Sequence, residues 1–167
     1  MVALVLQALS YGMFLAILVG PLFITLVNAG MQKGIRAALF IALGIWVSDV
    51  IMVGALIKLS QTFSIRLSDE VTKGLGILSG LVFTVVGIGI WLKRNQLIDE
   101  KLTSNRKHLS LFAYGFVINT INPFAIIFWI GLVTNYMLIR KISLLEALVF
   151  FGIIMFCIIV SDAVKVI

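Results

Sequence analysis

Two aspartates lie deep within apolar stretches of this 167-residue chain, and each follows a serine directly. In the first half, Gly20-Pro21 comes before Asp49 by the length of one helix, and in the second half Asn122-Pro123 comes before Asp162. An ionisable side chain inside a membrane helix is costly, and such residues commonly mark a substrate or proton path. A helix-breaking dipeptide followed by a buried acid, once in each half, predicts a duplicated membrane carrier with one central site.

Asp49 is the stronger candidate for coupling chemistry. It lies about twelve residues into an expected helix over 37–58, near the bilayer midplane, where a carboxylate costs roughly 2.5 to 3.5 kcal/mol. A neutral acid at this depth would lose its proton when a substrate ammonium arrives, which couples proton movement to substrate movement. The alternative is a structural acid that is hydrogen-bonded to Ser48, a neighbouring amide or a buried water.

Asp162 has a cation nearby in the sequence. Lys165 follows it by three residues, so on a helix the two side chains share a face and could neutralise each other as an ion pair. Lys165 could instead extend to the membrane interface, which would place Asp162 away from the midplane. A site role and a structural role for Asp162 both remain open.

The two proline dipeptides predict interruptions in membrane helices. Proline lacks a backbone N–H and clashes with the preceding turn, so Gly20-Pro21 and Asn122-Pro123 should each bend or unwind the helix. Free amides at the start of the resumed helix could bind a substrate carboxylate. Asn119 and Asn122, three residues apart, are expected on one face as further donors. The alternative is that both breaks are packing kinks.

Aromatic residues near these motifs could line a substrate cavity. Trp46 precedes Asp49 by three residues and should share its face, and Trp129 follows Asn122 by seven residues on one stripe. Plain packing is the alternative for both indoles. Other aromatic residues near the expected helix ends suit interfacial anchoring: Trp91, Tyr114 and Tyr136.

Composition places the chain in a lipid bilayer. Hydrophobic residues make up 62% of it, charged residues only 12%, and the mean hydropathy is +1.19, well above the values of soluble domains. The net charge of +6 comes from Lys and Arg between apolar stretches, which indicates membrane topology rather than nucleic-acid binding. The apolar runs are continuous, as in helices, and do not alternate as barrel strands do.

The expected architecture is an all-α integral membrane domain over 1–167. Five transmembrane helices are predicted, at 4–27, 37–58, 74–92, 110–134 and 144–167. A basic loop over 93–110 divides a first repeat (1–92) from an incomplete second repeat (111–167), and three-helix repeats must be inverted relative to each other. The expectation is therefore a truncated six-helix protein. A small excess of Lys and Arg places the loop in the cytoplasm and the N-terminus outside.

Several other functions find little support in the residue types. A single Cys157 excludes dithiol chemistry, and His108 lies in the polar loop, so neither a metal site nor a cofactor is expected. No catalytic constellation stands out, which disfavours an enzyme. Two alternatives stay open: a divalent metal-cation exporter, and a membrane scaffold that does not transport. Small residues at four-residue spacing could serve a homo-oligomer: Gly30, Gly34, Ala38 and Ala42, then Gly76, Gly80 and Thr84.

The stretch from Gly20 to Leu59 resembles the opening of the lysine exporter (LysE/RhtB) translocator family. The resemblance is carried by Gly20-Pro21, Gly34, Arg36, Gly44 and Asp49, and in the second half by Gly115-Phe116, Asn119 and Asn122-Pro123. It implies export of amino acids across a bacterial inner membrane, driven by protons. The chain departs from the family pattern at Val19, where a proline often stands, and at Phe124, where a lysine is usual. The substrate therefore does not follow from the resemblance.

Overall fold

The computed structural model describes residues 1–17, 20–62 and 108–166, together with single helical residues at 77, 81, 84 and 88. The described segments are helical, with no strand among them. The helices are α1 (Val2–Ile17), α2 (Pro21–Lys33), α3 (Ile35–Thr62), α5 (His108–Thr120), α6 (Pro123–Val133), the π-helix η1 (Thr134–Ile139) and α7 (Leu144–Val166). The expected span over 74–92 and most of the loop over 93–110 lie outside the described residues.

Among the described residues, two helices, α3 and α7, are long and apolar enough to cross a membrane. The expected span 37–58 lies within α3, and α7 follows the expected span 144–167 as far as Val166. The other two expected spans are broken rather than straight. The α1 and α2 axes differ by 55°, and the α5 axis differs by 61° from that of α6 with η1. Pro21 and Pro123 each begin a new helix, where a missing N–H has no cost. Counting each bent pair as one span raises the number of candidate spans in the described part of the chain to four.

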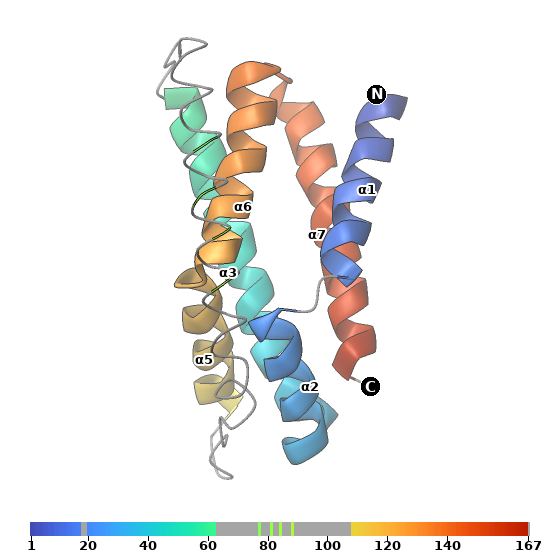
Figure 1. The fold of residues 1–167 in the computed structure, drawn as a ribbon, viewed down its shortest axis with the longest axis vertical. Coiled ribbons are helices and arrows are strands. Elements are labelled where there is room, and N and C mark those ends of the chain that lie inside the picture. Colours follow the sequence, from blue (N-terminus) through green and yellow to red (C-terminus); the bar gives the residue numbers. More distant parts are fainter. Residues whose placement is uncertain are drawn as a thin grey trace.

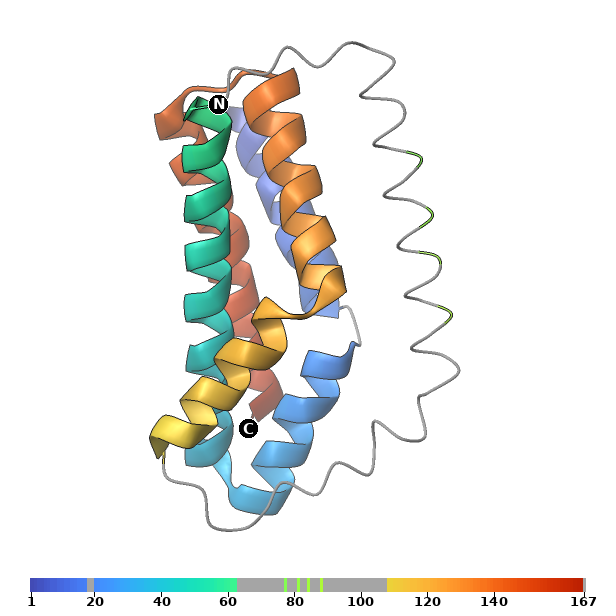
Figure 2. The same cartoon turned by 90° about the vertical axis from the view of Figure 1, so that its left-hand side faces the viewer.

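The two broken helices run in opposite directions (Figures 1 and 2). The α1–α2 pair descends from the end of the molecule labelled N, and α3 returns to that end. The α5–α6 pair ascends, and α7 descends to the end labelled C. The α5–α6 break lies beside the middle of α3, where Thr120 contacts Ser48, and the α1–α2 break lies beside the last turns of α7, where Ser161 contacts Ala16.

Close packing of α3 on α5 depends on two glycines. A Cβ atom on Gly44 would lie 2.1 Å from the Phe112 carbonyl oxygen, and one on Gly115 would lie 2.1 Å from the Ile41 carbonyl oxygen. Both distances are shorter than any real carbon contact, so the two backbones touch only because the side chains are absent. This contact sets how near the last turn of α5 comes to the polar centre of α3.

The buried apolar residues form two clusters. One joins α1, α3, α6 and α7 around the fully buried Trp129, Tyr136 and Phe150. The other joins α2, α3 and α5 around Leu26 and Ile41. Many large apolar side chains instead point outward, as on the outer face of α7, where Phe156 is 66% exposed. An apolar exterior of this kind is the surface that lipid covers in a membrane protein.

The stripe of small residues does not form one helix face. Gly34 lies between helices in the α2–α3 turn, with φ of +81°, a conformation that only glycine adopts freely. Ala38 and Ala42 are fully buried inside the molecule. These two alanines therefore serve internal packing, whereas Gly34 is exposed. Of the second stripe, Gly76 and Gly80 lie outside the described residues.

Candidate functional site

Asp49 lies in the middle of α3 and is 5% exposed. Two side chains from the second half of the chain donate to its Oδ1 atom: Asn119 through Nδ2 at 2.8 Å, and Trp129 through Nε1 at 2.8 Å. Hydrogen bonds from neutral donors to a carboxylate are stronger than those between neutral groups. The arrangement is therefore built to hold a charged or partly charged oxygen in an apolar surrounding.

The break between α5 and α6 brings both donors to the same acid. Asn119 lies in the last turn of α5, and the 61° bend then returns the chain so that Trp129 on α6 also points at Asp49. Asn122 caps α6, because its side-chain oxygen accepts from the Phe124 N–H at 3.1 Å. The expectation that Asn122 shares a donor face with Asn119 is therefore wrong, since the helix ends between them.

Asn119 is fully buried and only partly satisfied. Its amide nitrogen also donates to the Ile45 carbonyl at 3.2 Å, whereas its Oδ1 atom has no hydrogen-bond partner among the described residues. Buried polar atoms in folded proteins are nearly always paired. An acceptor without a partner beside Asp49 could receive a hydrogen bond from a bound donor or from the protonated acid.

Ser48 does not bond to Asp49, although it precedes that residue. Its hydroxyl pairs with the Thr120 hydroxyl at 2.9 Å, and Thr120 also donates to the Phe116 carbonyl at 2.7 Å. Of the structural partners expected for Asp49, the neighbouring amide is present, as Asn119. Ser48 instead adds a polar contact between α3 and the end of α5.

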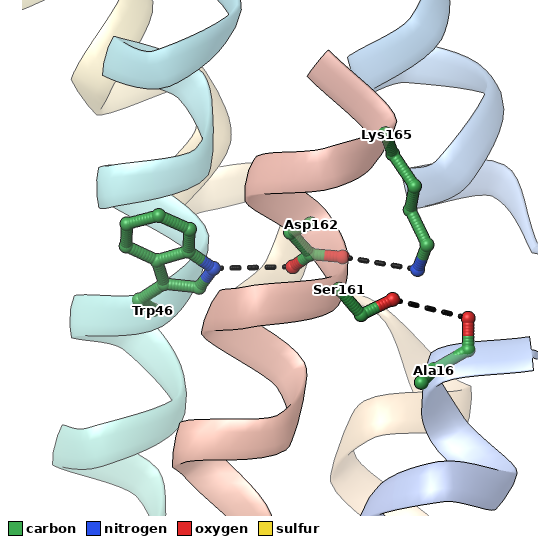
Figure 3. A network of polar contacts seen from close by, with 5 residues as sticks. All are labelled: Ala16, Trp46, Ser161, Asp162 and Lys165. Carbon is green, nitrogen blue, oxygen red and sulfur yellow. Dashed lines mark hydrogen bonds and ion pairs between the residues drawn. The ribbon is translucent and has the colours of Figure 1, made fainter. Parts of the chain in front are cut away.

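Asp162 on α7 is bound by two donors (Figure 3). The Trp46 indole donates to Oδ2 at 3.1 Å, and the Lys165 ammonium forms an ion pair with Oδ1 at 3.1 Å. The expected ion pair is thus present, with side chains that are 11% and 13% exposed for the acid and the lysine. Ser161 donates to the Ala16 carbonyl at 3.2 Å and joins α7 to the end of α1 beside its break.

Both tryptophans contact acids, and Trp46 does not bond to the acid whose helix face it was expected to share. Trp46 lies three residues from Asp49 on α3, yet its indole bonds to Asp162. Trp129 bonds to Asp49. Both indoles have polar partners and do more than fill space.

Gly20 caps α2 with an extended backbone, φ of −120°, and no side-chain cap is present. A Cβ at Gly20 would meet no atom within 4 Å, so neither backbone conformation nor space demands glycine here. Pro21 is the first residue of α2. The start of this helix lies near Asp162, because the Lys165 ammonium is 5.5 Å from the Phe23 ring centre.

A further polar cluster, formed by Gln7, Tyr136 and Arg140, lies away from Asp49 and Asp162. Sequence spacing alone does not reveal it. The Tyr136 hydroxyl donates to Gln7 Oε1 at 2.9 Å, and Arg140 donates to the same oxygen at 2.8 Å. Tyr136 is fully buried, so the expectation that it anchors the interface is wrong. It lies in the π-helix η1. This helix type is rare overall, but where it occurs it is often at a functional site. The sequence signal for this cluster is Gln7, a polar residue in an apolar run without charges.

Within the described segments, no three residues of the types His, Cys, Asp and Glu lie close enough together to hold a metal ion. The described polar centre contains two acids, Asp49 and Asp162, each with its own donors.

Comparisons with known proteins agree with the sequence motifs. A family model described as LysE type translocator matches residues 13–164, a range that contains both acids and both helix breaks. No curated protein and no solved structure matches the chain. The match spans nearly the whole sequence. The chain therefore belongs to the LysE type translocator family, whose members are multi-pass membrane transporters of amino acids or related compounds.

Proposed function

We propose that the protein exports amino acids or similar small zwitterionic metabolites across a bacterial inner membrane by proton antiport. The observation that carries this proposal is Asp49, a buried acid held by Asn119 and Trp129 from the second half of the chain. An ionisable group that is buried in a membrane helix and held by donors on either side of a helix break is suited to exchange a proton for a cationic group.

In this mechanism Asp49 is protonated before substrate binds. The unpaired Asn119 Oδ1 would accept a hydrogen bond from the protonated acid. A substrate ammonium arriving from the cytoplasm would displace the proton toward the cytoplasm, leaving a carboxylate stabilised by the two donors. On the outer side, a proton would return to Asp49 and the substrate would be released. Each cycle would thus move protons inward and substrate outward.

Alternating access needs elements that can move relative to the site. The breaks after Ile17 and after Thr120 divide each bent helix into two parts that could rotate independently. We regard 1–92 and 111–167 as belonging to two inverted repeats, and the opposite directions of the two bent pairs support this division (Figure 2). The loop over 93–110 would then lie in the cytoplasm, on the same side as the α2–α3 turn.

The proposed secondary position for substrate lies at Asp162. Trp46 and Lys165 hold this acid close to the start of α2. Gly20 and Pro21 leave the first amides of α2 without a side-chain cap, and such amides favour an anionic group. Within this region, the ammonium group of a zwitterion could therefore bind Asp162, and its carboxylate could bind the first amides of α2.

Reconstitution tests this function directly. The purified full chain would be placed in liposomes with an imposed pH gradient, and labelled amino acids would be screened for countertransport. We expect accumulation of at least one amino acid that collapses when a protonophore abolishes the gradient. Movement of none of them, together with movement of divalent metal ions, would reject amino-acid export.

A further inference from the structure

A cavity of about 630 Å³ opens beside the α2–α3 turn, away from Asp49. It is lined by three cationic residues from three helices: Lys33 in the last turn of α2, Arg36 in the first turn of α3, and Lys165 near the end of α7. Among the described residues that line it there is no Asp or Glu. The remaining lining residues are apolar or glycine, which gives a concave, mainly apolar site with a few convergent charges.

Helix stability does not account for Arg36. A cation in the first turn of a helix faces the positive end of the helix dipole, which is unfavourable. Membrane topology favours cations on the cytoplasmic side, but topology does not require three of them to converge on one cavity from three helices. The grouping instead creates a local positive potential in a site large enough for a small solute.

Lys165 belongs to the cavity and to the buried centre at the same time. It lines the cavity, and its ammonium pairs with Asp162 at 3.1 Å. An anion in the cavity would offer Lys165 a second partner, which would weaken its hold on Asp162 and leave that acid with the Trp46 bond. Binding in the cavity is thereby coupled to the acid that Lys165 neutralises.

We propose that this cavity is a carboxylate-binding entry site, at which Lys33, Arg36 and Lys165 receive the anionic end of the transported solute. This inference rests on the proposed export function and narrows its substrate class. Lys33 and Arg36, joined by Lys165 when an anion draws it from Asp162, attract zwitterionic or acidic amino acids and repel solutes with net positive charge. The site therefore favours substrates such as serine or glutamate over lysine, and it does not accept amines without a carboxylate.

Cysteine labelling measures the potential of the cavity without any transport. Met31 lines the cavity and is exposed, so a Met31→Cys variant would be made in a Cys157→Ser background. Its reaction rates with anionic methanethiosulfonate ethylsulfonate and with a cationic trimethylammonium analogue give a ratio that reports the local charge. We expect Arg36→Gln to lower the anionic-to-cationic ratio by roughly threefold to tenfold.

Lys58→Gln is the matched control, because it removes the same charge from the far end of the same helix. It should leave the ratio unchanged. Equal effects of Arg36→Gln and Lys58→Gln would mean that only net charge matters, and would overturn the proposal.

Protection by solutes identifies the occupant. In phosphatidylcholine liposomes, serine and glutamate should slow labelling of Met31→Cys, lysine should do so less, and ethanolamine, which lacks the carboxylate, should not. Equal protection by serine and ethanolamine would overturn carboxylate recognition. Addition of phosphatidylglycerol tests a lipid headgroup as the source of the anion: slowed labelling that serine cannot reverse would assign the cavity to lipid and overturn the entry site.

The two proposals can fail separately. Absence of proton-driven countertransport with normal labelling ratios and serine protection would reject antiport and leave the carboxylate site standing. Normal countertransport with no effect of Arg36→Gln on labelling or on protection would reject the entry site alone.

Discussion

Trp46 and Asp162 lie 116 positions apart and are joined by a hydrogen bond of 3.1 Å from the indole nitrogen to Oδ2 (Figure 3). The converse holds for the other acid, because Trp129 of the second half bonds to Asp49 of the first half at 2.8 Å. Each acid is thus held by a tryptophan from the opposite half. The polar centre is complete only when the two halves of the chain are packed together.

Replacement of Asp49 by asparagine tests the coupling role. The Asp49→Asn variant keeps the size of the side chain and an oxygen for the Asn119 and Trp129 donors, but it cannot exchange a proton. We expect normal insertion and loss of proton-driven countertransport to background in liposomes. Ser48→Ala is the control, since Ser48 is buried beside Asp49 but bonds to Thr120. Full transport by Asp49→Asn would defeat the assignment.

A double-mutant cycle tests which tryptophan holds Asp49. Trp129→Phe removes the indole donor and retains an aromatic ring. Because a hydrogen bond contributes about 0.5 to 1.5 kcal/mol between neutral groups and about 1.5 to 3 kcal/mol to a charged group, Trp129→Phe and Asp49→Leu, which removes the acceptor, should show a coupling energy of about 1 kcal/mol or more in thermal unfolding in detergent. Trp46→Phe should couple to Asp49→Leu by much less. The reverse order would contradict the geometry.

Removing one partner of the ion pair on α7 should lower the free energy of unfolding more than removing both partners does. Lys165→Gln leaves the Asp162 carboxylate with only Trp46, and we expect a loss of about 1 to 3 kcal/mol in the free energy of unfolding. The double variant Asp162→Asn, Lys165→Gln should recover much of this loss. A single and a double variant of equal stability would show that the pair is not coupled.

Transport by a charge-swapped variant separates structure from function at the same pair. If Asp162 takes part in binding, Asp162→Lys with Lys165→Asp should fold and lose export, because the acid no longer lies beside Trp46. Export at the level of the unmodified protein would assign the pair a structural role.

The glycine contact between α3 and α5 should tolerate no added carbon. Gly44→Ala and Gly115→Ala each place a Cβ about 2.1 Å from a backbone oxygen, which forces the helices apart at a cost of about 1 to 3 kcal/mol or more. Gly54→Ala is the matched control on α3, because nothing lies within 4 Å of its added Cβ. Thermal unfolding in detergent compares the three, and equal midpoints would disprove the close approach.

The Gln7 oxygen accepts from both Tyr136 and Arg140, so Gln7→Leu should destabilise the protein more than Tyr136→Phe does. Tyr136→Phe removes one neutral hydrogen bond, worth about 1 kcal/mol. Gln7→Leu leaves the buried Tyr136 hydroxyl without its acceptor. Unfolding of the two variants under the same conditions tests this order.

Local patterns in the sequence determined much of this protein. The hydropathy indicates membrane helices, Pro21 and Pro123 begin new helices where the chain bends, and the spacing of Asp162 and Lys165 predicts their ion pair. The motifs also indicate the family that the profile match confirms. Each of these features depends on residues within one or two helical turns, for which backbone geometry fixes the neighbours.

Only the tertiary structure decided which residues meet across helices. The spacing of Trp46 points to Asp49, and the fold joins it to Asp162. Neither the contact of Gly44 with α5 nor the convergence of Lys33, Arg36 and Lys165 on one cavity follows from spacing. The physical reason is that helices in lipid are apolar on both their inner and outer faces. Hydrophobic periodicity therefore does not reveal how each helix is rotated, and the rotation is set by close packing between distant segments.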